Sequence, residues 1–317
     1  MVLSILKHLM SLMKNLPIGI LFVWLLANGI SAAPKNAVVP AMDYRPVPDF
    51  FQFPAGYTLG EAPGVSMDSK GHIYIFHRGQ NPLLEFDTDG KFIKAWDVGD
   101  VARAHGLFID SQDDIWLVDV GNHTVRKFDS QGELLLTLGT PGQPGEDACH
   151  FNQPTDVAIG LDGDIYVSDG YGNSRVVKFS KDGQFISTWG KKGKGEGEFN
   201  LPHAIVVDSK GRVYVADRSN KRIQVFTPDG GFIAEWKNVG TPYGFYMSPA
   251  DEFYVTDGGG NRLLKMDIDG NILASMGSAG NGPGQFKLPH EVYVAPNGDI
   301  FISEITNHRV QKFVRND

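Results

Sequence analysis

Residues 204–217 read AIVVDSKGRVYVAD, and this stretch decides the fold. Two apolar runs of strand length flank a Ser-Lys-Gly turn, and two more follow at residues 222–226 and 232–236 after short polar turns. A helix would need apolar residues at a period of about 3.6 over a longer window, which these runs lack. The stretch therefore predicts four short strands joined by tight turns in one antiparallel meander.

The same meander recurs along the chain, which makes this a repeat protein. Counterparts of its second strand occupy residues 73–76, 115–118, 165–168, 253–256 and 300–303. Successive blocks lie about forty to fifty residues apart, and such a period with four strands per unit is typical of a β-propeller. We therefore predict an all-β fold, a six-bladed β-propeller.

The last repeat is one strand short, and we expect an N-terminal strand to close the ring. The sixth block ends near Asp317 after three strands. Residues 51–59, directly ahead of the first block, are available as the missing outer strand, and their pairing would leave no open sheet edge. This interpretation gives a propeller domain of residues 51–317, preceded by a linker of residues 34–50.

The first 33 residues have the layout of an export signal. Lys7 and Lys14 precede a nearly apolar stretch at residues 17–30, and small residues follow before the chain turns polar. This stretch is short for a membrane span, so residues 1–33 are interpreted as a signal peptide or an uncleaved N-terminal anchor. Both interpretations put the folded part outside the cytoplasm, secreted or periplasmic, with a membrane contact only if the segment is retained.

Composition narrows the range of partners. The formal net charge of −8 argues against nucleic acid, because proteins that bind it present basic surfaces. The single cysteine, Cys149, cannot form an internal disulfide, and a structural thiol is favoured over a nucleophile. The core and the sheet hydrogen bonds must therefore hold the fold together.

Three connections between repeats carry a phenylalanine three residues before a proline. These are Phe151, Phe199 and Phe286. We expect each ring to fill the space between two blades, while the proline fixes the backbone as it enters the innermost strand.

Histidine occupies one position of the repeat in alternate blocks. His105, His203 and His290 stand there in the second, fourth and sixth repeats, and the other repeats carry Gly64, Thr155 and Tyr243. In a closed ring the three imidazoles would point at the common axis about 120° apart, a geometry for one metal ion. Neutral imidazoles suit Zn²⁺ with an open fourth position, and Fe²⁺ or Cu²⁺ would accept the same ligands. The alternative is that each histidine only packs in the core.

Charged and phenolic residues follow the second strand at the same mouth of the channel. They are Arg78, Tyr171 and Arg218, and His77 beside Arg78 is interpreted as structural support. Two guanidinium groups beside a metal would bind a carboxylate, and a tyrosine near a cation can act as a base. The alternative for the arginines is a structural ion pair with a neighbouring acid such as Asp119 or Asp217.

The blocks resemble NHL repeats, whose Asp-Gly-Asn-Ile-Tyr-Val-Ala-Asp-like core is represented by DGDIYVSD at residues 162–169. Further motifs are Phe-His-Arg-Gly at 76–79, His-Gly-Leu at 105–107, Gln-Pro-Thr-Asp-Val at 153–157, Ser-Asp-Gly-Tyr at 168–171 and Ala-Asp-Arg at 216–218. In order and spacing they are similar to the catalytic domain of peptidyl-α-hydroxyglycine α-amidating lyase, a likeness that covers residues 60–314.

That resemblance implies a set of site residues and a reaction. It implies zinc at His105, His203 and His290, with Tyr171, Arg78 and Arg218 as catalytic residues. It also implies a structural calcium ion on the channel axis at Val65, Leu107 and Glu291, where glutamate replaces the family's aspartate. The reaction would cleave a peptidyl- or N-acyl-α-hydroxyglycine carboxylate to a primary amide and glyoxylate. The oxygenase that makes such a substrate would be a separate partner.

Two other functions stay open at this point. One is a metal-dependent lactonase-type hydrolase, which would rely on an acid- and Asn-rich calcium site rather than on three histidines. The other is a non-catalytic NHL binding propeller of the cell envelope, which would need no bound metal.

Overall fold

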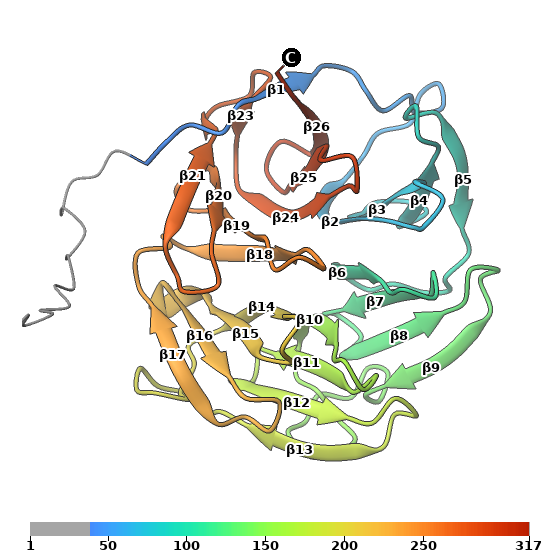
Figure 1. Cartoon of the computed structure of the whole chain (residues 1–317). Coiled ribbons are helices and arrows are strands. Elements are labelled where there is room, and N and C mark those ends of the chain that lie inside the picture. Colours follow the sequence, from blue (N-terminus) through green and yellow to red (C-terminus); the bar gives the residue numbers. More distant parts are fainter. Residues whose placement is uncertain (1–38, 317) are drawn as a thin grey trace, which may run out of the picture. The chain divides into compact units, whose positions relative to one another are not determined.

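The computed structural model describes residues 39–316, and these form six four-stranded antiparallel sheets arranged in a ring (Figure 1). The predicted signal peptide or anchor lies outside the described residues. Within residues 39–316 the only helix is one turn of 3-10 helix, η1 (Arg218–Asn220), so no described helix could cross a membrane. The predicted all-β, six-bladed propeller is confirmed.

Each sheet is one blade, and its strands run from the channel outward. Blade 1 is β2 (Glu61–Met67), β3 (Ile73–Arg78), β4 (Leu83–Phe86) and β5 (Phe92–Trp96); blade 2 is β6 (Ala104–Ile109), β7 (Ile115–Asp119), β8 (Thr124–Phe128) and β9 (Leu134–Leu138); blade 3 is β10 (Pro154–Ile159), β11 (Ile165–Asp169), β12 (Arg175–Phe179) and β13 (Phe185–Trp189). Blade 4 is β14 (Pro202–Val207), β15 (Val213–Asp217), β16 (Arg222–Phe226) and β17 (Phe232–Trp236); blade 5 is β18 (Pro242–Met247), β19 (Phe253–Asp257), β20 (Arg262–Met266) and β21 (Ile272–Met276); blade 6 is β24 (Pro289–Val294), β25 (Ile300–Glu304), β26 (Arg309–Arg315) and β1 (Tyr44–Val47). A small parallel pair, β22 (Ser278–Ala279) and β23 (Gln285–Phe286), lies in the connection to blade 6.

The core lies between the blades. The second strand of each blade is buried along almost its whole length, because both faces of the sheet are covered by neighbouring blades. Phe151, Phe199 and Phe286 are at most 1% exposed, and each belongs to an apolar cluster shared by two adjacent blades. The prediction that these rings fill the space between blades is confirmed.

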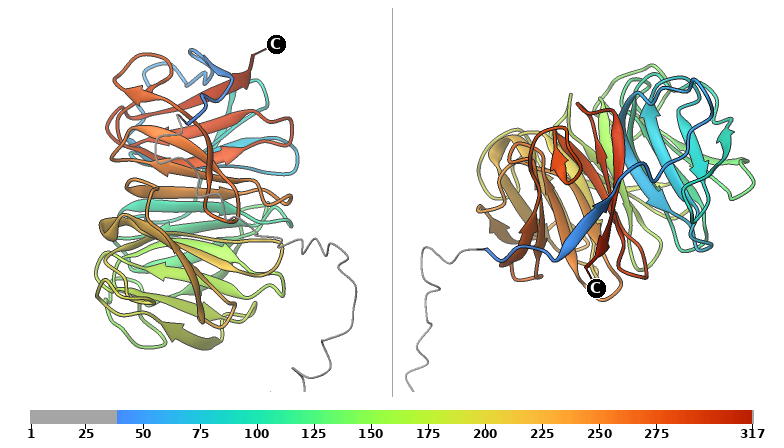
Figure 2. Two further views of the ribbon diagram at one scale, coloured as in Figure 1. Left: turned by 60° about the vertical axis from the view of Figure 1, so that its left-hand side comes forward. Right: turned by 90° about the horizontal axis from the view of Figure 1, so that it is seen from above.

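An N-terminal strand closes the ring, but it is not the predicted one. β1 (Tyr44–Val47) pairs antiparallel with β26, with Tyr44 opposite Arg315, and it lies beside the C-terminal end of the chain (Figure 2). The prediction that residues 51–59 supply this strand is wrong, and β1 lies inside the stretch predicted as a linker. The aromatic residues Phe50, Phe51 and Phe53 pack instead against Phe86 and Phe301, between the first and last blades.

The strand register of blade 1 corrects the repeat alignment by one residue. Val65 pairs with Ile75 as Ile205 pairs with Val215. Counting back two residues, the counterpart of His203 in blade 1 is Pro63, not the predicted Gly64. The carbonyl oxygen of Pro63 also accepts from Nδ1 of His290, as those of Thr155 and Tyr243 accept from the other two histidines.

Candidate functional site

Three imidazoles meet on the channel axis. His105, His203 and His290 are the second residues of β6, β14 and β24, the innermost strands of blades 2, 4 and 6. Their ring centroids are 4.7, 4.7 and 4.9 Å apart, and the residues are 1 to 3% exposed. The predicted convergence of the three histidines is thus present in the structure.

The backbone of the intervening blades fixes the tautomer of each ring. Each Nδ1 lies beside a carbonyl oxygen: His105 beside Thr155 at 2.6 Å, His203 beside Tyr243 at 2.7 Å and His290 beside Pro63 at 2.9 Å. A carbonyl oxygen can only accept, so each Nδ1 carries the hydrogen and donates it. The three Nε2 atoms therefore bear lone pairs. The accepting residues occupy the histidine position in blades 3, 5 and 1.

The surroundings keep the three rings neutral. Burial, reinforced by the charges of nearby arginines, lowers the pKa of His290 to about 3. Burial lowers the pKa of His105 and His203 well below the usual value, and charge on the neighbouring imidazoles adds to this. One ligand atom from each residue lies within 4.8 Å of the other two. Three buried, neutral imidazoles with fixed tautomers fit a divalent metal ion.

Tyr171 lies directly beside the imidazoles. It follows β11 of blade 3, and its hydroxyl oxygen is 3.2 Å from Nε2 of both His105 and His203. Nη1 of Arg218 donates to the same oxygen at 3.2 Å, and the guanidinium group lies 5.2 Å from the Tyr171 ring centre and 4.8 Å from that of Tyr243. The Tyr171 hydroxyl oxygen therefore lies within hydrogen-bonding distance of two imidazoles and one guanidinium group.

Arg78, at the end of β3, is held by two acceptors. Nε donates to the carbonyl oxygen of Ala104 at 3.0 Å, and Nη1 forms an ion pair with Oε2 of Glu61 at 2.6 Å. Its charge acts on both His105 and His290, which places it near the metal-ligand set.

Neither Asp119 nor Asp217 is the partner of these arginines, but Arg78 does form an ion pair with another neighbouring acid, Glu61. Asp119 accepts backbone N–H groups of residues 102, 103, 121 and 122. Asp217 pairs with Arg222 at 2.7 Å. Sequence reasoning missed Glu61. Its signal was an acid at a register where the other blades carry Arg103, Gln153, Leu201, Thr241 and Leu288.

His77 is a structural residue, as predicted. It is completely buried, and its Nδ1 accepts the backbone N–H of Gly60 at 3.2 Å. Nε2 therefore carries the hydrogen, which faces the hydroxyl of Tyr57 at 2.9 Å and the carbonyl of Asn81 at 3.2 Å. These bonds hold the segment that enters β2 and so position the neighbouring Arg78.

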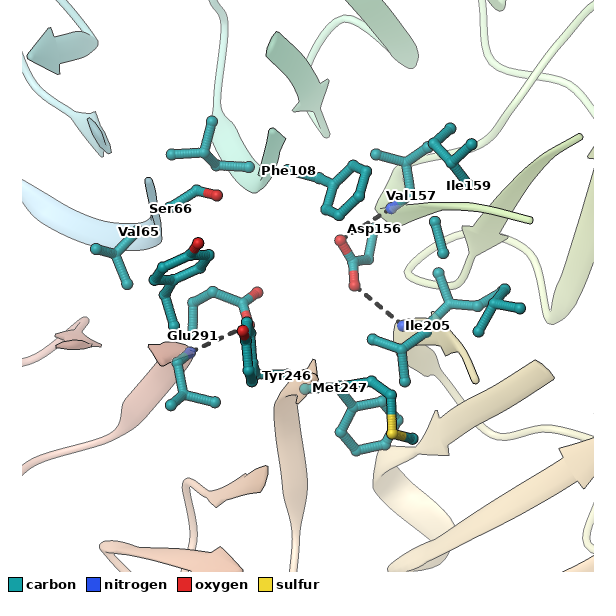
Figure 3. A pocket seen from close by; sticks show the side chains of 17 residues that line it. Val65, Ser66, Phe108, Asp156, Val157, Ile159, Ile205, Tyr246, Met247 and Glu291 are labelled. Atoms are coloured by element: carbon teal, nitrogen blue, oxygen red, sulfur yellow. Dashed lines mark hydrogen bonds between the residues drawn. The ribbon is translucent and has the colours of Figure 1, made fainter. Parts of the chain in front are cut away.

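The predicted calcium residues line a separate cavity of about 190 Å³ on the channel axis (Figure 3). Val65, Leu107 and Glu291 all face it, and Asp156 of blade 3 lies across from Glu291. Asp156 accepts the backbone N–H groups of Val157 at 2.9 Å and Ile205 at 3.0 Å.

Both acids in this cavity are perturbed by burial. Burial raises the pKa of Asp156 to about 7. Burial also raises the pKa of Glu291 well above its usual value, and the charge of Asp156 adds to this. Asp156 stands within a motif quoted above, but sequence reasoning did not include it among the ligands. Two buried carboxyl groups in one small cavity are a donor set that suits a hard cation.

Repeats, fold and inner-strand pattern together define the class of protein, an NHL-repeat β-propeller. The NHL repeat model matches residues 102–128, 151–179 and 199–226. Human NHL repeat-containing protein 3 is 36% identical over 284 residues, covering 81% of this chain and 80% of that protein. The chain therefore belongs to the NHL-repeat family.

Within that family the relatives include amidating lyases, as the sequence motifs predicted. A probable peptidyl-alpha-hydroxyglycine alpha-amidating lyase of Caenorhabditis elegans is 27% identical over 292 residues, covering 80% of this chain and 82% of that protein. Among solved structures, a streptogramin B lyase matches with a TM-score of 0.63 at 17% identity, covering 86% of this chain and 97% of that one. A gluconolactonase of Xanthomonas campestris matches with a TM-score of 0.63 at 15% identity, covering 90% and 99%. At such identities these two structures share the fold alone.

Proposed function

We propose that the protein is a metal-dependent lyase that cleaves peptidyl- or N-acyl-α-hydroxyglycine to a primary amide and glyoxylate. The observation that carries the proposal is the position of the Tyr171 hydroxyl oxygen, 3.2 Å from two imidazole Nε2 atoms and from the Arg218 guanidinium. A phenol in that position is activated as a base beside a centre able to hold a metal. The similarity to named amidating lyases supports the same class of reaction.

The three histidines would hold the ion, and Zn²⁺, Fe²⁺ and Cu²⁺ all suit their donor set. When bound, the ion supplies a Lewis acid for an oxygen of the substrate. The protein's own contribution is to present three neutral Nε2 atoms in an arrangement that the Nδ1 hydrogen bonds to Thr155, Tyr243 and Pro63 keep fixed.

The remaining residues would bind the substrate and move its proton. Arg78 binds the substrate carboxylate through a charge-assisted hydrogen bond. Tyr171 accepts the proton of the α-hydroxyl group, and Arg218 stabilises the tyrosinate that makes this transfer favourable. As the hydroxyl carbon becomes the aldehyde of glyoxylate, its bond to nitrogen breaks, and the nitrogen takes up a proton to give the primary amide.

The proposed function also includes a structural calcium site, export from the cytoplasm and a separate oxygenase as partner. A calcium ion bound by Val65, Leu107 and Glu291, with Asp156 as an additional carboxylate, would stiffen β24 next to His290. Export by residues 1–33 would place the enzyme outside the cytoplasm, where a separate oxygenase would supply its carboxylate-bearing substrate. No nucleic-acid partner is expected at a net charge of −8.

Glyoxylate release from α-hydroxyhippurate by the zinc-loaded protein tests the reaction. We expect Tyr171→Phe to lower the rate by about 10²-fold or more, because the proton acceptor is removed. Circular dichroism of both proteins controls for folding. Equal glyoxylate release by the two proteins would exclude the proposed reaction.

A non-catalytic binding propeller is the second candidate, because the human relative is named only for its repeats. Metal analysis of protein purified without chelators separates the two candidates. Less than about 0.2 zinc, iron or copper ions per chain would favour the binding propeller, since a three-histidine site is expected to retain its metal. Hydrolysis of a lactone panel with calcium, without glyoxylate release, would identify a lactonase instead.

A further inference from the structure

An ion pair between a lysine and an acid recurs in four of the blades. It lies at the second and third strands, away from the innermost strands that carry the three histidines. A lysine of the third strand reaches the acid that directly precedes the second strand. The pairs are Lys127–Asp114 at 2.6 Å, Lys178–Asp164 at 3.1 Å, Lys265–Glu252 at 2.5 Å and Lys312–Asp299 at 2.9 Å, in blades 2, 3, 5 and 6. Each lysine also lies over the aromatic ring of the second strand, so the pair is part of the repeat scaffold.

Blade 1 has the opposite charges at these two positions. Glu85 pairs across the sheet with Tyr74 as Lys127 pairs with Trp116, so Glu85 takes the place of the lysine. His72 takes the place of the acid, directly before β3. Nδ1 of His72 lies 2.8 Å from Oε1 of Glu85 and 3.7 Å from Oδ2 of Asp68. Two carboxylates therefore gather around an imidazole in blade 1, whereas in blade 2 the two carboxylates, those of Asp110 and Asp114, lie beside Lys127.

Hydrogen bonds orient the carboxylates toward the imidazole. Oδ1 of Asp68 accepts the backbone N–H groups of residues 70 and 72, which leaves Oδ2 with the Tyr74 hydroxyl at 3.4 Å. Oε2 of Glu85 accepts the indole N–H of Trp96 at 2.9 Å, which leaves Oε1 for His72. The free ligand atoms of Asp68, His72 and Glu85 all lie within 4.8 Å of one another.

The local charge calls for a cation. Glu85 is 5% exposed, and its closest lysine, Lys94, is 49% exposed and 3.8 Å away. Two carboxylates so close together repel each other unless a positive charge lies between them. His72 is about one-third exposed, so an ion bound there would keep open positions for water.

We propose that Asp68, His72 and Glu85 form a second metal site, for a borderline divalent cation such as Zn²⁺, on blade 1. One nitrogen and two carboxylate oxygens suit such an ion, and the bonds from Trp96 and the backbone pre-orient the ligands. The simpler interpretation is a charge-swapped copy of the scaffold ion pair. The central group distinguishes the two interpretations: in blade 2 the two carboxylates share Lys127, whose ammonium group has no lone pair, whereas His72 offers an imidazole nitrogen that can bind a metal ion.

Calorimetric titration with ZnCl₂ counts the ions bound. We expect two ions per wild-type chain and one in the double variant His72→Asp with Glu85→Lys, which installs the ion pair of blade 2. The indole N–H signal of Trp96 should shift with the second ion in the wild type only. His72→Gln is the milder variant, and it should weaken the second site at least tenfold.

Equal zinc stoichiometry in the wild type and the double variant would overturn the proposal, as would an unmoved Trp96 signal. A His203→Ala chain should lose the ion of the three-histidine site and keep the ion on blade 1. This separates failure of the second site from failure of the proposed lyase site.

Discussion

Blade 1 differs from the other five blades at the residue where the second strand ends. In blades 2 to 6 this residue is an acid: Asp119, Asp169, Asp217, Asp257 and Glu304. Each acid accepts backbone N–H groups from the loop that leads into the innermost strand of its own blade. Four of them also pair with an arginine of the third strand, at 2.5 to 2.9 Å. In blade 1 the equivalent residue is His77, because Ile73 pairs with Phe86 as Val213 pairs with Phe226; Arg78 is the next residue, at the position of Arg218.

This difference shows how a repeat can keep a structural hydrogen bond with another residue type. His77 stands at the position of the acid, and its Nδ1 accepts the backbone N–H of Gly60 as each acid accepts an N–H group of its own loop. Arg78 follows it at the position of Arg218, and Glu61 balances the charge of Arg78. The loop that leads into β2 is thus held without a carboxylate.

The largest effect is expected where the acid is still structural. Asp217→Ala leaves the buried Arg222 without its closest partner and should lower the free energy of unfolding by about 3 kcal/mol. Urea denaturation measures the change. Arg78→Gln in blade 1 is the comparison, because it removes a partly exposed ion pair, and it should lower the free energy of unfolding by less than about 1 kcal/mol. Equal losses in the two variants would mean that Arg78 is as important for stability as Asp217.

Acid sensitivity tests whether His77 replaces the missing acid. Burial lowers its pKa to about 4, so the fold favours the neutral ring and the unfolded chain binds more protons below about pH 6.5. This contribution is complete above pH 6.5 and is lost as the pH falls toward 4, by about 3 kcal/mol at most. His77→Gln should therefore flatten the dependence of melting temperature on pH between 6.5 and 4. An unchanged profile would contradict this role.

Catalytic activity should depend on Arg78 more strongly than the stability of the fold does. Arg78→Gln should lower kcat/KM for α-hydroxyhippurate by about 10²-fold, or about 2.7 kcal/mol, because the substrate carboxylate loses its charged partner. Steady-state glyoxylate release is the measurement, and Arg78→Lys should restore part of the loss. Wild-type kcat/KM in Arg78→Gln would show that the carboxylate is bound elsewhere.

The smallest effect is expected at Glu61. Its carboxylate occupies Nη1 of Arg78 at 2.6 Å and would therefore compete with the carboxylate of the proposed substrate. Glu61→Gln removes the competing charge and should lower KM by about three- to tenfold at nearly constant kcat, an effect of about 1 kcal/mol. A rise in KM would show instead that Glu61 is needed to hold Arg78 in position.

The sequence predicted the parts of the fold and site that repeat. The spacing of apolar segments identified the six blades. Histidine at one repeat position in alternate blocks identified His105, His203 and His290. The closing strand escaped because Tyr44–Val47 is short and contains a proline, whereas the aromatic run after it resembles a strand but serves as packing. The sequence did not predict the partners of Arg78. Several acids lie nearby, and the loop conformation decides which of them already accept backbone N–H groups.

Pairing of β1 with β26 also sets the order in which the site can assemble on the ribosome. Tyr44 is made long before Arg315, and blade 6, which carries His290, is the last blade to emerge. Contacts between residues so distant in sequence form late, because the loop between them must first be closed. A nascent chain therefore exposes His105 and His203 well before the third imidazole arrives. In the proposed metal-dependent enzyme, binding of the ion and closure of the ring would be the same late step in biosynthesis.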